Sequence, residues 1–150
     1  MKRSLIAALV VCAGTGFAVA ETVAPADVVY EDGAIMASLT GVPGDPANGR
    51  KVFANRKKGN CLACHALEDQ SEQLFHGEIG PPLDGVGEYW EEANLRGLLV
   101  NSKMVFEGTM MPAFYVDNAT LNRVMSKFDG KTILTAQEVE DVIAYLMLQK

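Results

Sequence analysis

The sequence predicts an all-α domain preceded by an irregular N-terminal arm. Residue patterns that start helices occur at Asp45-Pro46 and again at Thr135-Ala136-Gln137-Glu138. The second pattern precedes apolar residues that repeat with the period of a helix. No strand-rich stretch appears between them. The domain is therefore expected to span residues 46–150, and the arm to span residues 21–45.

Residues 1–20 have the pattern of a secretory signal peptide. The basic start Met1-Lys2-Arg3 precedes an apolar run over residues 5–20, which ends in the A-x-A cleavage site Ala18-Val19-Ala20. A retained membrane anchor is the alternative, but the run is short for a span of about 20 residues and contains glycine. We expect cleavage before Glu21, release of the mature chain into the periplasm and no membrane segment after cleavage.

The arm, residues 21–45, contains glycines and prolines and shows no regular amphipathic period. It nevertheless carries larger apolar side chains, at Val23, Val28, Val29, Tyr30, Ile35, Met36 and Leu39. An exported monomer would gain little by displaying them. We therefore expect the arm to pack against a partner subunit, where burial would stabilise it. Folding back onto its own domain is the alternative.

A first helix is predicted to begin after the arm. Asp45-Pro46 supplies the N-cap and the first helical residue, and Gly59 is a natural stop. Val52 and Phe53 form its buried side. The basic residues 56–58 then fall in its last turn, where cations suit the helix dipole. A docking patch is the alternative interpretation of this basic cluster.

Further along the chain, helices alternate with loops that contain proline or glycine. Gly80-Pro81-Pro82-Leu83 is incompatible with regular structure, and residues 107–113 form a second loop. Residues 88–103 are predicted to form one or two helices. The terminal helix follows the capping motif at Thr135. Its apolar face consists of Val139, Val142, Ile143, Leu146 and Met147.

The segment Cys61-Leu62-Ala63-Cys64-His65 has the spacing C-x-x-C-H, which is the attachment site of a c-type haem. The two thiols form thioether bonds to one porphyrin, and the adjacent imidazole of His65 becomes the proximal iron ligand. The motif occurs once, so we expect one covalent haem c. A thioredoxin-like redox pair would need a strand before the motif. A zinc site needs about four ligands, and His76 is the one further candidate in the mature chain.

Cleavage of the signal peptide also changes the cysteine count and the charge. Cys61 and Cys64 are the two cysteines that remain, and the haem uses both, so no structural disulfide is expected. Losing Lys2 and Arg3 leaves 11 basic side chains against 19 acidic ones, a net charge of −8. This charge disfavours nucleic-acid binding. It fits a partner with a basic face or serves solubility alone, and the sequence leaves both open.

A six-coordinate haem needs a second axial ligand. Met110-Met111-Pro112 lies on a loop that can wrap the far face of the porphyrin, with Met111 placed 46 residues after His65. The following proline stiffens the backbone there. We predict Met111 as the ligand and Met110 as the second choice, and a thioether ligand raises the reduction potential. His76 is the bis-histidine alternative, although a surface role is more ordinary for it. The other methionine candidates are Met36, Met104, Met125 and Met147, and the last three are expected to pack on helices.

With these parts in order, the chain resembles class I cytochromes c from about residue 46 to its end. The shared order is an N-terminal helix, C-x-x-C-H, G-P-x-L, an M-P loop and a terminal helix. The resemblance implies the class I cytochrome c fold, in which the Pro81 carbonyl accepts a hydrogen bond from His65 and Leu83 packs on the porphyrin. It also implies that Gly49 and Phe53 cross the terminal helix near Tyr145.

A narrower resemblance, to the SoxX family, covers nearly all of the mature chain. It rests on GRKVFA (49–54), GNCLACH (59–65), GEIGPPLDGVG (77–87), TMMPAF (109–114) and the arm segment ASLTG (37–41). SoxX is the monohaem subunit of the SoxAX cytochrome of periplasmic thiosulfate oxidation. The resemblance implies three partners, namely a SoxA-like haem subunit, the SoxYZ carrier protein and a soluble cytochrome c that accepts electrons.

By the same resemblance, the complete enzyme is an L-cysteine S-thiosulfotransferase that oxidatively joins thiosulfate to a carrier cysteine. This chain would be its electron-transfer subunit and not catalytic alone, because both thiols of the mature chain are alkylated. A free periplasmic electron shuttle is the alternative, and a haem sensor with an open sixth position is a third interpretation. The arm favours the subunit, since a shuttle needs little beyond its haem domain, and Met111 disfavours the sensor.

Overall fold

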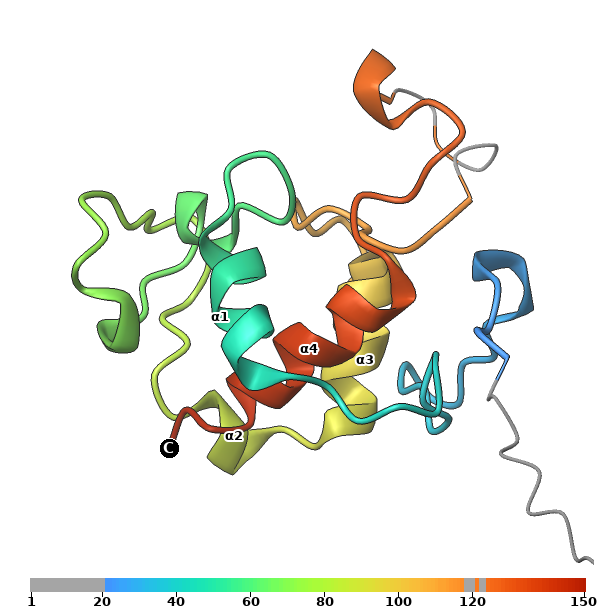
Figure 1. Cartoon of the computed structure of the whole chain (residues 1–150), viewed down its shortest axis with the longest axis horizontal. Helices are drawn as coiled ribbons and strands as arrows, with labels where there is room; N and C mark the ends of the chain where they lie inside the picture. Colours follow the sequence, from blue (N-terminus) through green and yellow to red (C-terminus); the bar gives the residue numbers. More distant parts are fainter. Residues whose placement is uncertain (1–20, 118–120, 122–123) are drawn as a thin grey trace, which may run out of the picture.

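The computed structural model describes residues 21–117, 121 and 124–150, and the predicted signal peptide lies outside them. Over these residues the structure is helical, with one isolated β-bridge between Glu31 and Ala34. The prediction of an all-α fold is therefore confirmed. The α-helices are α1 (Pro46–Ala54), α2 (Val86–Tyr89), α3 (Glu92–Asn101) and α4 (Ala136–Leu146) (Figure 1). No helix among the described residues is long and apolar enough to cross a membrane.

Short 3₁₀ turns connect these helices. Among the described residues these turns are Cys61–Ala63, Glu68–Gln70, Ser102–Met104 and Ser126–Phe128, and a further one, Pro25–Asp27, lies in the arm before α1. The region predicted to hold one or two helices thus contains the end of α2, all of α3 and a 3₁₀ turn. Leu95 and Leu99 on α3 are each 4% exposed, whereas Leu98 is half-buried.

Helix α1 begins where the sequence predicts. The Asp45 carboxylate accepts a hydrogen bond from the Ala47 amide at 2.9 Å, and Pro46 occupies the first turn. Val52 and Phe53 are 4% and 1% exposed, so the predicted apolar side faces the core.

The same helix ends earlier than expected, at Ala54 rather than near Gly59. Asn55 has an extended backbone, and its side-chain oxygen accepts a hydrogen bond from the Lys57 amide at 2.9 Å. This local bond gives the backbone an alternative to another helical turn. Residues 56–58 therefore lie in a turn beyond α1, and the prediction that they occupy its last turn is wrong.

Helix α4 is capped as the sequence predicts. The Thr135 hydroxyl accepts a hydrogen bond from the Glu138 amide at 3.2 Å, and the Glu138 carboxylate accepts one from the Thr135 amide at 3.0 Å. Its apolar face is buried, since Val139, Val142, Ile143 and Leu146 are at most 4% exposed. Met147 is half-buried against the same core.

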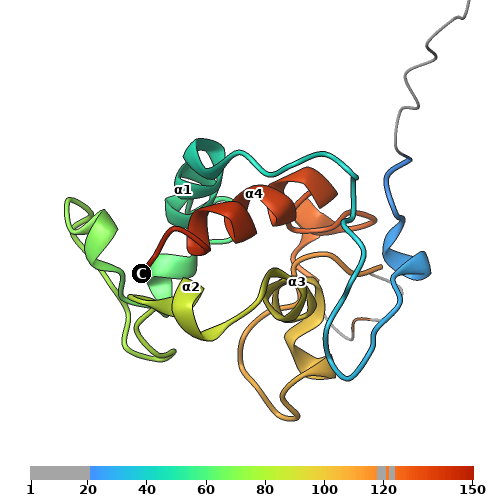
Figure 2. The ribbon, with the colours of Figure 1, turned by 90° about the horizontal axis from the view of Figure 1, so that it is seen from below.

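Helix α4 lies between α1 and α3 and packs on both (Figures 1 and 2). Helix α1 approaches closely at Gly49, where a Cβ atom would lie 2.0 Å from the Asp141 carbonyl oxygen. The Phe53 ring then meets the Tyr145 ring edge-on, with centroids 5.7 Å apart. This is the helix crossing that the resemblance to class I cytochromes c implies.

The arm packs on its own domain, which corrects the expectation that it is reserved for a partner. Ile35 and Leu39 are 3% and 1% exposed and belong to the main core. The Ile35 amide donates a hydrogen bond to the Ala93 carbonyl of α3 at 2.9 Å, and the Tyr115 hydroxyl donates one to the Val23 carbonyl at 2.7 Å. An extended chain buries single side chains without any helical period, so the irregular pattern did not reveal this packing.

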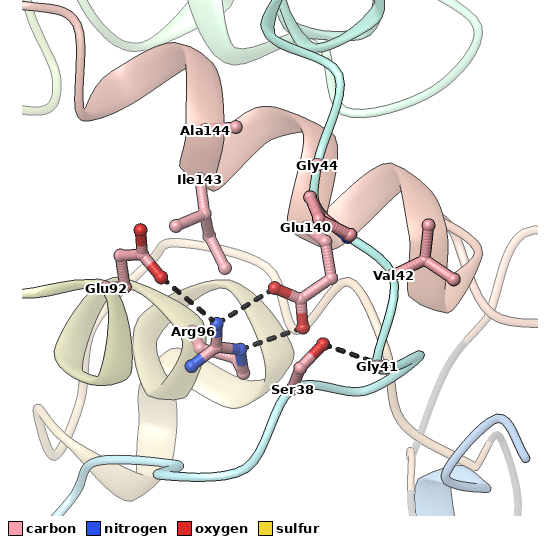
Figure 3. A pocket seen from close by; sticks show the side chains of 10 residues that line it. Ser38, Gly41, Val42, Gly44, Glu92, Arg96, Glu140, Ile143 and Ala144 are labelled. Atoms are coloured by element: carbon pink, nitrogen blue, oxygen red, sulfur yellow. Dashed lines mark hydrogen bonds and ion pairs between the residues drawn. The ribbon is translucent and has the colours of Figure 1, made fainter. Parts of the chain in front are cut away.

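A buried ion pair anchors the arm (Figure 3). Arg96 of α3 bonds Glu140 of α4 in a bidentate pair, Nε to Oε1 at 2.8 Å and Nη2 to Oε2 at 2.9 Å, and the two side chains are 5% and 6% exposed. Arg96 also donates to the Ile35 carbonyl at 2.9 Å, and Glu140 accepts from the Leu39 amide at 2.7 Å. Each buried charge therefore has a counter-charge and a backbone partner, which makes its burial tolerable.

The cavity drawn in Figure 3 lies beside this ion pair and has a volume of about 400 Å³. The arm lines it with residues 41–44 and Ser38, whose hydroxyl accepts a hydrogen bond from the Gly41 amide at 3.1 Å. Arg96, the cationic residue that lines the cavity, already bonds Glu140 and the backbone of the arm. The cavity therefore belongs to the anchoring of the arm.

Candidate haem site

The C-x-x-C-H motif folds into a single tight turn. Asn60 adopts a left-handed backbone with φ of 51°, and Cys61–Ala63 forms a 3₁₀ turn. The Cys64 and His65 amides both donate to the Cys61 carbonyl, at 3.0 and 2.9 Å. The two thiols and the imidazole thus all project from one hydrogen-bonded turn, as attachment to a single porphyrin requires.

Neither Cys61 nor Cys64 forms a disulfide. Cys61 packs against the main core, and burial raises the pKa of its thiol to about 12. As a free thiol it would be protonated at neutral pH, and a protonated thiol is a poor nucleophile. The packing of Cys61 and its raised pKa therefore argue against a reactive free cysteine.

The His65 ring is oriented by the loop that the sequence predicts. Its Nδ1 lies 2.7 Å from the Pro81 carbonyl oxygen. Since a carbonyl only accepts, Nδ1 carries the proton and Nε2 is left as the lone-pair donor for a metal. Gly80 adds a constraint that the sequence did not indicate, because a Cβ there would lie 2.3 Å from His65 Cε1.

Two backbone bonds fasten this loop to the motif. The Gly80 amide donates to the Cys64 carbonyl at 2.8 Å, and the Leu83 amide donates to the Ala66 carbonyl at 2.9 Å. Leu83 is half-buried and packs against the core. Its predicted contact with the porphyrin stays a prediction.

The structure separates the two consecutive methionines of the M-P loop. Met110 is 80% exposed, whereas Met111 is half-buried and packs against the core. The Met111 amide donates to the Thr109 hydroxyl at 3.3 Å, and the Met111 carbonyl accepts from the Ser102 hydroxyl at 2.7 Å. The Lys103 ammonium also contacts that carbonyl. Both backbone groups of Met111 are therefore held in place.

Ser102 lies outside the M-P loop but bonds to it, and no pattern in the sequence indicates this contact. It is 0% exposed and follows α3 in the turn Ser102–Met104. A serine after a helix carries no signal for a contact nine residues away.

Two other methionines differ from expectation. Met104 and Met125 are 57% and 65% exposed and lie at 3₁₀ turns, so the prediction that they pack on helices is wrong. Both turns are too short to form an inward-facing apolar stripe. Met147 packs against the core as predicted.

His76 is tied into its own loop. Its Nδ1 accepts a hydrogen bond from the Leu67 amide at 3.3 Å, and its Nε2 lies 3.0 Å from the Gln70 carbonyl, to which it donates. The ring is half-buried, so the expected surface histidine is instead a structural one. Iron ligation by His76 would break one of these hydrogen bonds, which disfavours the bis-histidine alternative.

A polar network fixes the segment that follows the motif. The Tyr145 hydroxyl donates to the Asp69 carboxylate at 2.6 Å, and Arg50 bonds Asp69 at 2.9 Å and Glu72 at 3.0 Å. The Tyr145 hydroxyl, and next the Arg50 guanidinium, lower the pKa of Asp69. Burial, and next the Asp69 carboxylate, raise the pKa of Tyr145. The network therefore ties residues 69–72 to α1 and α4.

The donor set fits a haem c. Two thiols and an imidazole share one turn, a thioether is half-buried on the M-P loop, and the imidazole has one nitrogen already fixed. Among the described residues no group of three or more His, Cys, Asp or Glu side chains could hold a metal ion on its own. A bound haem c supplies one-electron redox chemistry at its iron.

Together with the crossing of α1 and α4, this donor set defines a class I c-type cytochrome. Residues 46–150 match the family model described as Cytochrome c, and the chain belongs to that family.

Among solved structures, the chain is similar to the crystal structure of SoxXA from P. pantotrophus. The two sequences are 47% identical, the match covers 85% of this chain and 97% of the other, and the TM-score is 0.78. The chain thus resembles SoxX, as its motifs indicate. A crystal structure of the c-type cytochrome SorU from Sinorhizobium meliloti is 26% identical and covers 69% of this chain and 88% of its own, with a TM-score of 0.46.

An uncharacterized lipoprotein from Aquifex aeolicus (strain VF5) is 34% identical over 90 residues. The match covers 60% of this chain, and the chain spans only 36% of the length of that relative.

Proposed function

We propose that this protein is the monohaem electron-transfer subunit of a SoxAX-type cytochrome in the periplasm. It receives electrons from the oxidative coupling of thiosulfate to a cysteine of a SoxYZ carrier protein and passes them to a soluble cytochrome c. The observation that carries this proposal is the 47% identity to the SoxXA structure over 97% of the matched chain.

Each predicted site residue has a role in this proposal. Cys61 and Cys64 hold one covalent haem c, and His65 and Met111 are its axial ligands. The Pro81 carbonyl at 2.7 Å fixes the His65 ring, and Leu83 packs on the porphyrin. The half-buried position of Met111 and the 80% exposure of Met110 support the choice between the two methionines.

The chain is the electron-transfer part of an L-cysteine S-thiosulfotransferase and does not catalyse the coupling itself. Both cysteines of the mature chain are consumed by the haem, and both nitrogens of His76 are hydrogen-bonded within its loop. Thiosulfate chemistry therefore belongs to a SoxA-like haem subunit, and the chain carries electrons away from it.

A free periplasmic shuttle is the second candidate. The arm does not distinguish the shuttle from the SoxAX subunit, because it packs on its own domain. The discriminating experiment is purification of the mature protein from a periplasm that also contains its natural partners.

The proposal predicts one haem adduct on a chain that begins at Glu21, and a second haem-bearing subunit that co-purifies with it. Thiosulfate together with a SoxYZ carrier should then reduce the haem of this chain. A monomeric cytochrome that is reduced by other cytochromes but never by the thiosulfate system would establish the shuttle instead.

A further inference from the structure

One loop of the described chain displays large apolar side chains to solvent. Leu74, Phe75 and Ile79 are 103%, 60% and 66% exposed and lie within six residues of one another. The polar network around Asp69 fixes the start of this segment. Clustered exposed apolar residues on a fixed segment mark an interaction site more often than scattered ones do.

The loop also forms one wall of a groove of about 440 Å³. Its other lining residues include Leu62 and Ala63, the two residues between the haem-attaching cysteines. The groove therefore lies directly against the attachment turn. A protein seated in it would contact the turn whose cysteines would hold the haem.

One rim of the groove is basic, in a chain whose mature net charge is −8. Arg56 lines it and Lys57 follows in the same turn, and both are exposed. Within the described part of the chain neither forms an ion pair, whereas the next residue, Lys58, pairs with Glu138. An occupant with an acidic rim would complement these two cations.

We propose that this groove, with Leu74 and Phe75 as its apolar anchors and Arg56 and Lys57 as its basic rim, docks the haem-bearing partner subunit. The inference rests on the proposed function and adds the location of the contact. A stable partner is favoured over a transient electron acceptor because large exposed apolar side chains suit a permanent interface, which is more hydrophobic than a transient one.

The loop of residues 66–80, which forms one wall of the groove, and residues 21–40 of the arm lie on opposite sides of the helices, as both views of the ribbon show (Figures 1 and 2). Docking at the groove leaves the contacts of the arm with α3 and α4 intact. The arm can therefore supply a control that the partner does not touch.

The test uses the mature holoprotein and its co-expressed haem-bearing partner. The double variant Leu74→Ser/Phe75→Ser removes the anchors, and we expect its affinity for the partner to fall by about 30-fold or more, as for interface hot spots. The double variant Val29→Ser/Leu148→Ser is the matched control, since these side chains are 69% and 64% exposed elsewhere on the surface. The control should bind within about twofold of wild type.

A charge-reversed pair, Arg56→Glu/Lys57→Glu, tests the rim separately. It should slow association at low ionic strength and remove most of the salt dependence of the association rate. The absorption spectrum of the haem should be unchanged in all of these variants, which shows that each is folded.

The outcomes are distinguishable. If the wild-type holoprotein binds no haem-bearing subunit, the proposed function fails. If wild type binds and the groove variants bind equally well, only the location is refuted. Normal partner binding with slower electron transfer to a soluble acceptor would assign the groove to that acceptor, and loss of self-association alone would assign it to a second copy. Both results overturn the inference.

Discussion

Removal of the Ser102 hydroxyl tests whether the backbone contact at Met111 supports iron ligation. Ser102 is 0% exposed, and its hydroxyl lies 2.7 Å from the Met111 carbonyl. Because Lys103 contacts the same carbonyl, Ser102→Ala leaves no buried acceptor unpaired. The loss is then the net value of one hydrogen bond, about 1 kcal/mol, which corresponds to about fivefold in the equilibrium between bound and displaced methionine.

The assay is a titration of the ferric protein with imidazole, which competes with Met111 for the iron. The weak absorption band at the red end of the spectrum reports iron–thioether ligation and disappears as imidazole binds. We expect Ser102→Ala to bind imidazole about five times more tightly than wild type. Ser102→Thr keeps the hydroxyl and should stay closer to wild type. Ser126→Ala, at an exposed serine of another 3₁₀ turn, is the control.

Equal imidazole affinity in Ser102→Ala and Ser126→Ala would refute the reasoning. A lower melting temperature of Ser102→Ala without a change in imidazole affinity would also refute it, because Ser102 would then stabilise the fold and not the ligand loop.

Met111→Ala should abolish the red-end absorption band and lower the reduction potential of the haem. Met110→Ala should change neither, because the Met110 side chain is 80% exposed. Spectroelectrochemistry measures both properties, and equal effects of the two variants would contradict the assignment of Met111 as the ligand. Glu140→Gln should lower the free energy of unfolding by about 3 kcal/mol, since it removes the buried bidentate partner of Arg96 and leaves only the exposed Glu92 carboxylate, 3.8 Å away. Denaturant titration measures this, and an unchanged midpoint argues against it. Asp69→Asn should destabilise the protein modestly, by less than about 1 kcal/mol for such an exposed pair. Because the pKa of Asp69 is lowered in the folded state, its stabilisation is present above the unfolded pKa of about 3.9 and is lost as the pH falls through the folded value. The gap between Asp69→Asn and wild type should therefore close in acid, and a gap that is constant with pH would exclude this cause.

Short sequence motifs correctly located the elements that are stabilised by contacts between residues close together in the sequence. The capping box at Thr135 and Glu138 involves residues three positions apart, and the C-x-x-C-H turn is five residues long. The capping box appears in the structure as predicted, and the motif folds within its own length. The end of α1 is also local, but a side-chain bond from Asn55 to the Lys57 amide competes with the helix there, and Gly59 was the stronger stop signal.

Contacts between distant residues were not visible in the sequence. Arg96 and Glu140 lie 44 residues apart, and neither belongs to a motif. The arm depends on this pair, so its docking could not be predicted from its own composition. Likewise, the sequence ranked Met111 above Met110 from the following proline, but the difference in burial and the bond from Ser102 are visible only in the structure.

The anchoring of the arm also sets an order of events during biogenesis. In the N-terminus-first export that the proposed function requires, Leu39 would cross the membrane 101 residues before Glu140, whose carboxylate accepts a hydrogen bond from the Leu39 amide. The arm therefore has nowhere to dock until almost the whole chain has crossed. Contacts that close such long loops form late, because their entropy cost precedes any gain. On that proposal, the arm would be the first part of the mature chain to cross and among the last to be fixed, and it would stay accessible to proteases and chaperones until the C-terminal helix follows.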